Sequence, residues 1–313
     1  MLDDARLDAA LVASIVQSQF SELSPATAVY LGEGCDSTAF EVNGLWVFRF
    51  PKRAEVERQL AIESRVLPVL AGTSPLPLPV FSFLGGPSAA YPYRFAGYRK
   101  LPGMPALQVG DRTMPIASWA PVMGRFLSWL HQFPVSEALA LGVERQDVAA
   151  LIEEARSDAL DDFDVLSEVM AAAPLPQWRE YVAAGCESMA STASAPVVVH
   201  RDLASEHVLY DPARQQVTGI IDWGEIAISD RSVDIAAFFH WGGRPCAEAV
   251  LSAYAGPVDA GVLRRARFLA ACRGIADVAF GVDTRRLEYV EAGARALRRC
   301  LGGSGVPIPD PTG

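Results

Sequence analysis

The first apolar positions of the chain follow a helical period, and the positions after them follow a strand period. Large apolar side chains recur three or four residues apart at Leu7, Leu11, Val12, Ile15, Val16 and Phe20. This spacing predicts a packed helix. Three β-rich runs follow, TAVYLGEG, STAFEVNG and LWVFRF, with glycines in the turns between them. The Asn43–Gly44 pair before the third run favours a tight hairpin.

Helical periodicity returns over 55–70, and two more strands are predicted near 79–84 and 93–100. The Pro/Gly-rich stretch LPGMP at 101–105 then marks the best candidate domain boundary. We therefore place an N-terminal, β-rich domain with a leading helix at 1–101.

The remainder of the chain is mainly helical, interrupted by one pair of short strands, HVLYD and VTGIIDW. The helices predicted there span 115–133, 147–170, 176–192, 232–241, 245–254, 260–281 and 284–301. We expect a helical domain at 102–301, a flexible tail at 302–313, and an α+β fold for the whole chain.

Composition excludes several classes of function. The 313 residues carry 37 acidic and 27 basic side chains, a formal net charge of −10. Because phosphate backbones select basic surfaces, we expect no nucleic-acid partner, and a cationic small molecule fits the balance better. Five cysteines without a CxxC pair predict reduced thiols rather than a zinc cluster. Without a signal-peptide pattern or an apolar run of roughly 18 residues, we expect a cytoplasmic monomer that binds no membrane.

The stretch VVVHRDLASEHVLYD at 197–211 concentrates the candidate chemistry. It holds two of the four histidines, His200 and His207, with Asp202 between them. By itself, this stretch is compatible with a metal site, an acid/base centre or the polar end of a strand. Twenty residues after Asp202, the run IIDWGE places Asp222 at the end of an apolar strand.

Motifs elsewhere in the chain give this stretch a context. The order is a glycine-containing hairpin (LGEGCDS), a basic residue on the third strand (WVFRFPK), a helix glutamate, then YRKLPGMP, HRDLASEH, IIDW and SDRSVDIA. This order resembles the protein-kinase signature. It is more closely similar to the aminoglycoside phosphotransferase family, which includes macrolide kinases, over residues 27 to about 240.

The resemblance implies a bilobal, protein-kinase-like fold and transfer of the γ-phosphate of ATP or GTP to a hydroxyl group, with Mg²⁺. Asp202 would be the catalytic base that accepts the proton of the hydroxyl. Asp222 and His207 would be the metal-site residues. Because Mg²⁺ prefers oxygen ligands, His207 would bind it through a water or hold it weakly.

The same resemblance implies a nucleotide site in the N-terminal domain. Arg49 would contact the α- and β-phosphates, with Lys52 as the alternative. Val47 and Arg49 share one face of the strand, so valine can line the purine site. Glu63 would orient the basic residue. The other nucleotide-binding positions are Gly32, Gly34 and Ser37 in the hairpin, and Arg99, Lys100 and Leu101 in the hinge after Tyr98.

Four residues are predicted to support the site structurally. His200 would brace the catalytic loop, and Asp234 would accept backbone N–H groups of that loop. Arg201 departs from the antibiotic kinases, which more often have glycine or asparagine there, and is interpreted as an ion-pair partner of Asp234 or Asp230. About seven residues separate Asp222 from Asp230, too few for the activation segment of a protein-serine kinase.

The acceptor is the least determined part of the function. An aminoglycoside is the favoured acceptor, a macrolide 2′-hydroxyl is the first alternative, and a metabolic small molecule is another. A pseudokinase that only binds nucleotide or a partner is disfavoured by the intact Asp202 and Asp222. The sequence leaves the choice between ATP and GTP open.

Overall fold

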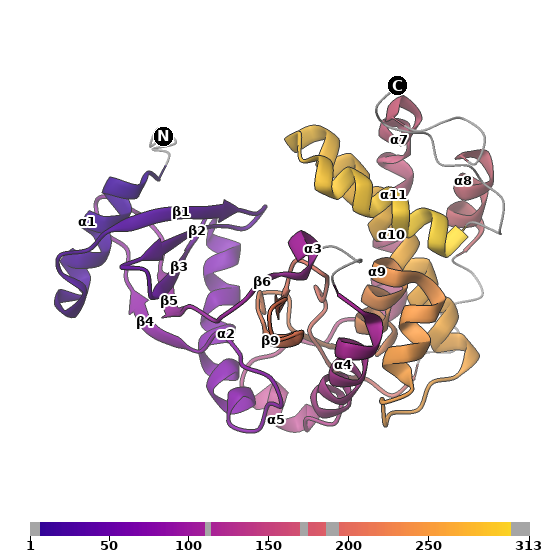
Figure 1. Cartoon of the computed structure of the whole chain (residues 1–313), viewed down its shortest axis with the longest axis horizontal. Coiled ribbons are helices and arrows are strands. Elements are labelled where there is room, and N and C mark those ends of the chain that lie inside the picture. Colours follow the sequence, from indigo (N-terminus) through magenta and orange to yellow (C-terminus); the bar gives the residue numbers. More distant parts are fainter. Residues whose placement is uncertain (1–6, 110–113, 170–174, 186–193, 302–313) are drawn as a thin grey trace. The chain divides into compact units, whose positions relative to one another are not determined.

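The computed structural model describes residues 7–109, 114–169, 175–185 and 194–301. The chain forms two compact units, and the N-terminal one consists of residues 1–103 together with 218–225. Residues 104–217 and 226–313 make up the second. The first unit is mainly an antiparallel sheet and the second is mainly helical (Figure 1). The α+β fold with a β-rich N-terminal part is therefore confirmed.

A five-stranded antiparallel sheet of order β1-β2-β3-β5-β4 forms the centre of the N-terminal unit. Its strands are β1 (Ala28–Glu33), β2 (Ser37–Val42), β3 (Trp46–Pro51), β4 (Phe81–Gly85) and β5 (Phe95–Arg99). The helices of this unit are α1 (Ala9–Gln19), the short 3-10 turn η1 (Ser21–Leu23) and α2 (Ala54–Ala71). Asp8 caps α1 by accepting a hydrogen bond from the Leu11 N–H at 2.8 Å.

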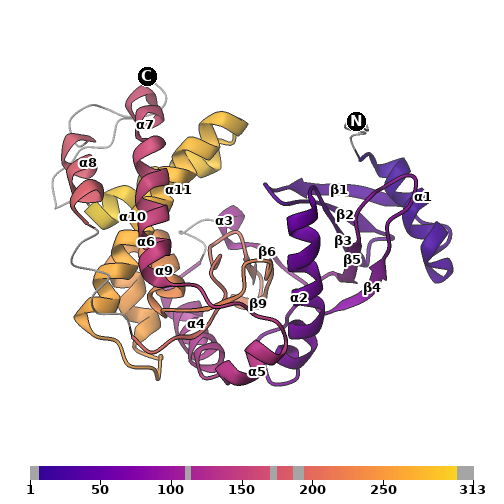
Figure 2. The same ribbon diagram turned by 180° about the vertical axis from the view of Figure 1, so that it is seen from behind.

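Alternation along β3 decides which side chains enter the core. Phe48 and Phe50 point to the face that packs with Val12, Ile15 and Val16 of α1 in one apolar cluster. The neighbouring Arg49 lies on the other face, where it meets α2 through Glu63. The two helices consequently lie on opposite faces of the sheet (Figures 1 and 2).

Residues 218–225 belong to the N-terminal unit although they are distant in sequence. The Ile220 N–H donates to the carbonyl oxygen of Pro77 at 3.1 Å, and the Thr218 hydroxyl donates to that of Pro102 at 2.6 Å. A Cβ on Gly219 would lie 2.7 Å from Leu101 Cδ1, so glycine is required for this close approach. The predicted boundary at 101/102 did not include this second segment.

The helical unit also contains short strands. Its helices are α3 (Ala106–Val109), α4 (Ile116–His131), α5 (Val135–Ala140), α6 (Val148–Asp161), α7 (Phe163–Val169), α8 (Leu175–Ala184), α9 (Ser232–Leu251), α10 (Ala260–Thr284) and α11 (Leu287–Leu301). Its strands are β6 (Met104–Pro105), β7 (Val197–Val199), β8 (Val208–Asp211) and β10 (Ala227–Ser229). Strand β9 (Gln216–Ile220) begins in this unit, and its residues 218–220 belong to the N-terminal one. The sheet orders are β6-β8-β9 and β10-β7. Helices α9, α10 and α11 pack against one another (Figure 2).

Two helix boundaries differ from the periodicity. The helix predicted at 147–170 is divided at Asp162 into α6 and α7, and the two helices predicted at 232–241 and 245–254 form one helix, α9, that is kinked at Gly243. Gly243 has φ 68° and ψ −163°, a conformation that favours glycine. The predicted tail at 302–313 and the end of the 176–192 helix lie outside the described residues. None of the helices in the described part is long and apolar enough to cross a membrane.

Candidate active site

The loop between β7 and β8 carries Asp202 and is fixed by Asp234, in the first turn of α9. The Asp234 carboxylate accepts the backbone N–H of His200 at 3.0 Å and that of Arg201 at 2.9 Å. His131 Nε2 of α4 also lies 3.1 Å from Asp234 Oδ2. Arg201 has φ 70°, and these carboxylate contacts hold the loop in that uncommon conformation. Asp234 thus accepts backbone N–H groups of this loop, whereas the bracing role expected of the His200 side chain stays a prediction.

Asp202 is held in the same loop by an arginine that the sequence interpretation did not single out. Arg273 of α10 donates from Nη1 to Asp202 Oδ1 at 2.7 Å and from Nη2 to Glu206 Oε1 at 3.0 Å. Burial would raise the pKa of Asp202, but Arg273 and His207 outweigh burial and lower it to about 2. Asp202 is therefore ionised at neutral pH, as a proton acceptor must be.

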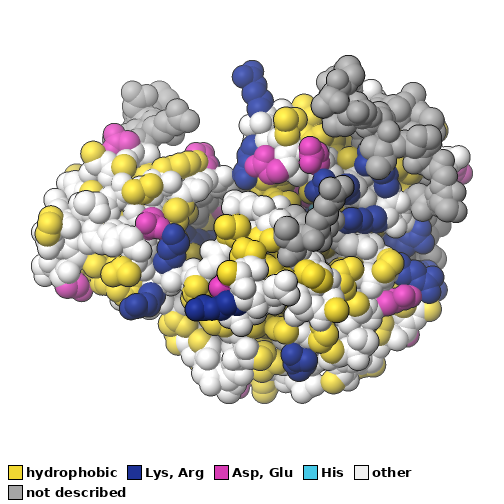
Figure 3. All heavy atoms as spheres, in the orientation of Figure 1, with side chains coloured by type: hydrophobic (Ala, Val, Ile, Leu, Met, Phe, Trp, Pro, Cys, Tyr) yellow, Lys and Arg dark blue, Asp and Glu magenta, His cyan; other side chains and the backbone are white. Residues whose placement is uncertain are grey.

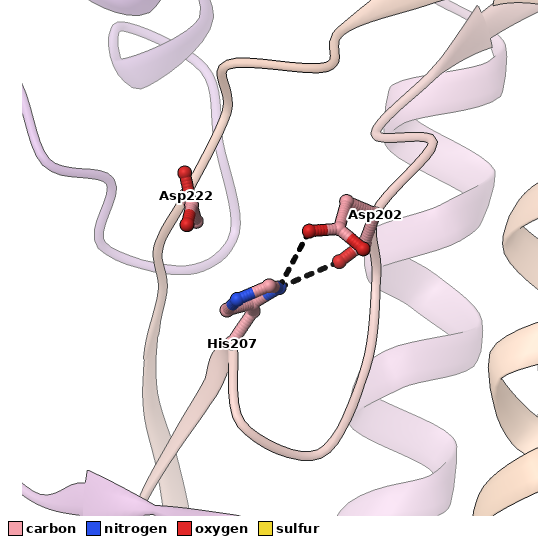
Figure 4. Close-up of side chains that lie close together, drawn as sticks. All are labelled: Asp202, His207 and Asp222. Carbon is pink, nitrogen blue, oxygen red and sulfur yellow. Dashed lines mark hydrogen bonds and ion pairs between the residues drawn. The ribbon is translucent and has the colours of Figure 1, made fainter. Parts of the chain in front are cut away.

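His207 is oriented by the backbone of the loop (Figure 4). Its Nδ1 lies 2.7 Å from the Asp202 carbonyl oxygen and 3.4 Å from Asp202 Oδ2. A carbonyl oxygen only accepts hydrogen bonds, so Nδ1 carries the proton in this contact. In the neutral ring, the lone pair that could bind a metal is then on Nε2. Metal-binding histidines commonly donate their other ring N–H to a backbone carbonyl in this way.

In the N-terminal unit, Arg49 joins two carboxylates. Its Nη1 donates to Glu63 Oε2 of α2 at 2.7 Å, and its Nη2 donates to Asp222 Oδ1 at 2.9 Å. The Glu63 side chain is 1% exposed, whereas that of Asp222 is 43% exposed. Burial would lower the pKa of Arg49, but both carboxylates raise it, so the guanidinium stays charged. The structure thus brings together three residues that are up to 173 positions apart in sequence.

Asp222 adopts a backbone conformation that non-glycine residues seldom have, with φ 63°. One neighbour of Asp222 is buried: Trp223 donates from Nε1 to the Ile220 carbonyl oxygen at 3.1 Å. A Cβ on the next residue, Gly224, would lie 3.6 Å from Glu63 Oε1, an ordinary contact. Strained backbone of this kind is concentrated at functional sites.

Lys52, the alternative to Arg49, is placed differently. It pairs with Glu33 and donates to the Gly34 carbonyl oxygen at 2.8 Å, at the tip of the β1–β2 hairpin. Because its partners belong to that hairpin and Arg49 contacts both Glu63 and Asp222, the geometry favours Arg49 as the phosphate contact.

Steric contacts within the protein do not explain the glycines of the β1–β2 hairpin, Gly32 and Gly34. A Cβ at Gly32 or Gly34 would meet no atom within 4 Å, so neighbouring side chains do not explain these residues. Ser37 Oγ is shielded from solvent and has no hydrogen-bond partner in the described structure. A hydroxyl without a hydrogen-bond partner at the start of β2 is compatible with the predicted phosphate contact.

The predicted hinge follows β5. Arg99 and Lys100 are exposed and Leu101 is half-buried. The Lys100 N–H donates to the Leu45 carbonyl oxygen at 2.8 Å, its ammonium pairs with Glu41, and Leu101 packs against Gly219. Tyr98 is buried beside Val47, its partner in the sheet. The prediction that these backbone groups bind a purine stays a prediction.

Asp230 takes a structural position in the helical unit. Arg265 of α10 donates from Nη2 to Asp230 Oδ2 at 2.8 Å, and both side chains are buried. The backbone N–H and hydroxyl of Ser194 and the backbone N–H of Ser232 also donate to this carboxylate, at 3.0, 2.7 and 2.9 Å. Arg265 thus provides an ion pair for Asp230, while the pairing expected of Arg201 with Asp234 or Asp230 stays a prediction.

Asp230 should make the stability of the fold dependent on acidic pH. Burial would raise its pKa, but hydrogen bonds from Ser232 and Ser194 outweigh burial and lower it to about 2, from an ordinary value of 3.8. Because the pKa is lower in the folded protein than in the unfolded chain, the ionised carboxylate stabilises the fold fully at pH values above 3.8. This stabilisation is lost as the pH falls toward 2. We expect a loss of about 2 kcal/mol in the free energy of unfolding over this range, measured by urea unfolding.

The Asp230→Asn variant isolates this contribution. It should be less stable than the wild type near neutral pH, and its stability should depend less on pH below about 4. Parallel pH profiles for the variant and the wild type would contradict the assignment.

The sequence pattern did not indicate the roles of two arginines, Arg265 and Arg273. Both lie on α10 and pair with residues 35 and 71 positions away. A charged residue in a helical segment is ordinarily solvated, so only the tertiary structure identifies these contacts.

Comparisons with known proteins are consistent with this geometry. A model of the phosphotransferase enzyme family (APH) matches residues 27–269. An aminoglycoside 3′-phosphotransferase of Streptomyces fradiae is 34% identical over 110 residues, which cover 34% of this chain and only 38% of that relative. This chain therefore aligns with well under half of the length of that curated relative.

Solved structures cover nearly the whole chain. The GDP and kanamycin complex of the aminoglycoside phosphotransferase APH(2")-IIia has 26% sequence identity and a TM-score of 0.73, covering 94% of this chain and 99% of that one. The macrolide 2′-phosphotransferase MphH from Brachybacterium faecium has 22% identity and a TM-score of 0.61, covering 93% and 97%. At that identity the macrolide enzyme shows only a shared fold. Since the family model covers most of the sequence, the chain belongs to the phosphotransferase enzyme family.

Proposed function

We propose that this protein is a nucleoside-triphosphate-dependent kinase that transfers the γ-phosphate to a hydroxyl group of an aminoglycoside. The observation that carries the proposal is the pairing of Arg49 with both Glu63 and Asp222. Phosphoryl transfer depends mainly on positioning and on stabilisation of charge. A buried, permanently charged guanidinium held by a helix glutamate supplies both at the nucleotide phosphates.

Asp202 is proposed as the catalytic base. Its carboxylate is ionised, one oxygen is bonded to Arg273, and the side chain is 33% exposed and thus accessible to an acceptor. As the acceptor oxygen attacks the γ-phosphorus, its proton would pass to this carboxylate, the bond from the γ-phosphorus to the β–γ bridging oxygen would break, and the nucleoside diphosphate would leave. Arg49 would bind the α- and β-phosphate oxygens, while Glu63 keeps the guanidinium directed at them.

Asp222 and His207 are proposed to hold Mg²⁺ (the side chains are drawn in Figure 4). The donor set fits a divalent cation, because Asp222 offers a half-exposed carboxylate and His207 the Nε2 lone pair. The bound ion would supply neutralisation of the negative charge on the β- and γ-phosphates. The nitrogen ligand is less suited to Mg²⁺ than the amide oxygen that usually stands at this position in the resembling families.

Changing His207 should alter metal preference. Imidazole favours Mn²⁺ over Mg²⁺ relative to an oxygen ligand, so His207→Asn should shift the preference toward Mg²⁺, by about tenfold in the ratio of the two dissociation constants. His207→Ala should weaken both ions. The constants are measured by calorimetry in the presence of a non-hydrolysable nucleotide. An unchanged ratio in His207→Asn would show that the imidazole does not contact the ion.

Three observations support an aminoglycoside as the acceptor. Of the two solved structures described above, APH(2")-IIia has the higher TM-score and was solved with kanamycin. The Streptomyces fradiae relative is an aminoglycoside 3′-phosphotransferase. The chain has a net charge of −10. The net charge describes the whole chain and not one surface. On the face drawn in Figure 3, Lys and Arg side chains lie among Asp and Glu side chains. Net charge alone therefore does not locate the acceptor surface.

The proposal is tested by transfer of labelled phosphate from ATP and from GTP to a panel of aminoglycosides and macrolides. We expect at least one aminoglycoside to be phosphorylated, and comparison of the two donors gives the nucleotide preference. Turnover of macrolides alone would overturn the acceptor class and leave the mechanism standing. Nucleotide binding without turnover of any acceptor would count against the antibiotic-kinase assignment and favour a metabolic kinase or a pseudokinase.

A further inference from the structure

Arg273 connects two carboxylates of one loop. Its Nη1 and Nη2 donate to Asp202 and Glu206, which are four residues apart between β7 and β8, at 2.7 and 3.0 Å. A guanidinium is planar and its donors have a fixed spacing, so this double contact restricts both carboxylates at once. The Arg273 side chain is only 28% exposed, so water competes little with the two carboxylates for its N–H groups.

Arg273 also faces a third carboxylate, at a longer distance. Asp277, one turn along α10, places Oδ1 4.0 Å from Arg273 Nε. The other oxygen of Asp277 lies 2.9 Å from His240 Nε2 of α9. Arg273 Nε has no hydrogen-bond partner in the described part of the structure, so the restraint on the loop comes from the two contacts to Asp202 and Glu206.

These contacts leave the two Asp202 oxygens in different environments. Oδ1 accepts a hydrogen bond from Arg273. Oδ2 lies 3.4 Å from His207 Nδ1, which is farther than the 2.7 Å between that nitrogen and the Asp202 carbonyl oxygen. We propose that Arg273 is a positioning residue for phosphoryl transfer, which fixes the Asp202 carboxylate and, through Glu206, its loop, so that Oδ2 meets the acceptor hydroxyl in one orientation. This inference rests on the proposed kinase function.

A competing interpretation gives Arg273 a purely electrostatic role. The guanidinium faces the carboxylates of Asp202, Glu206 and Asp277, so it could occupy the place of an ammonium group of the acceptor. The two roles predict opposite effects. Removal of a positioning residue lowers kcat, whereas removal of a competing cation lowers the acceptor KM.

The test compares Arg273→Gln and Arg273→Lys with Arg264→Gln, a control at an exposed position of the same helix. The acceptor is whichever member of the antibiotic panel the wild-type protein phosphorylates. We expect Arg273→Gln to lower kcat about 100-fold, with the KM for nucleotide within about threefold of the wild type. Arg273→Lys should recover part of the loss, since it keeps the charge but not the double contact. An unchanged kcat, or a lower acceptor KM with unchanged kcat, would overturn the proposal.

A second measurement needs no acceptor. Hydrogen exchange is followed in the peptide that spans 200–211, where the His207 N–H is bonded to the Ala204 carbonyl oxygen at 3.1 Å. Exchange should accelerate about tenfold or more in Arg273→Gln and remain unchanged in Arg264→Gln. Equal exchange in all three proteins would mean that Arg273 does not hold the loop, and the inference fails. If no acceptor reacts, the proposed function fails, and this measurement still decides whether Arg273 fixes the loop.

Discussion

Replacing Asp202 by asparagine should lower kcat for phosphate transfer about a thousandfold, with little change in the KM for nucleotide. The amide keeps the size of the side chain and a hydrogen bond to the acceptor hydroxyl, but it cannot accept the proton that the hydroxyl loses. The effect should be large because Asp202 is ionised in the folded protein, with its pKa lowered to about 2 by Arg273 and His207 against the effect of burial. Steady-state kinetics with the accepted antibiotic measures both constants.

Asp211→Asn is the matched control for this variant. Asp211 lies at the end of β8, a few residues after the loop, and its carboxylate accepts the backbone N–H groups of Ala213 and Arg214 in a turn. Asparagine can make the same turn contacts, so turnover should stay within about twofold of the wild type. If Asp202→Asn kept a similar share of activity, Asp202 would not be the base.

The second large effect is expected at Arg49. The Arg49→Met variant leaves the Glu63 carboxylate without its partner at a position that is 1% exposed. Removing one member of a buried ion pair costs about 3 kcal/mol or more in the free energy of unfolding, which urea unfolding measures. Turnover should fall as well, because the cation proposed to bind the α- and β-phosphates is absent.

The double variant Arg49→Met/Glu63→Met separates the two effects. With both charges removed, much of the lost stability should return, whereas nucleotide affinity should not. Lys52→Met is the control, because the Lys52–Glu33 pair is partly exposed and contributes at most about 1 kcal/mol. A loss of nucleotide affinity in Lys52→Met, with normal affinity in the double variant, would reverse the choice between the two basic residues.

The sequence predicted those parts of the fold and the site that depend on local pattern. Strand alternation placed Arg49 and Phe48 on opposite faces of β3, which the contacts to Glu63 and to the α1 core confirm. The ordered motifs indicated the family to which the chain belongs, which the family model confirms, whereas a joint role of Asp202, His207 and Asp222 stays a prediction. Local pattern succeeds here because strand alternation and the order of short motifs can be recognised without knowing their tertiary contacts.

Long-range pairings were not predictable in the same way. Arg273 and Arg265 are ordinary helix residues by periodicity, and no sequence signal relates them to Asp202 or Asp230. The division of the 147–170 helix at Asp162 and the joining of two predicted helices across Gly243 also depend on packing rather than on propensity. The sequence likewise gave no reason to assign 218–225 to the N-terminal unit.

The assignment of 218–225 to the N-terminal unit has a consequence for synthesis on the ribosome. Residues 1–103 emerge first, but Asp222, one of the two carboxylates on Arg49, emerges roughly 120 residues later. At ordinary translation rates of about 5–20 residues per second, this delay is roughly 6 to 24 s. During that interval Arg49 has only Glu63 of its two carboxylate partners, so the N-terminal unit can complete its structure only after about half of the helical unit has been translated.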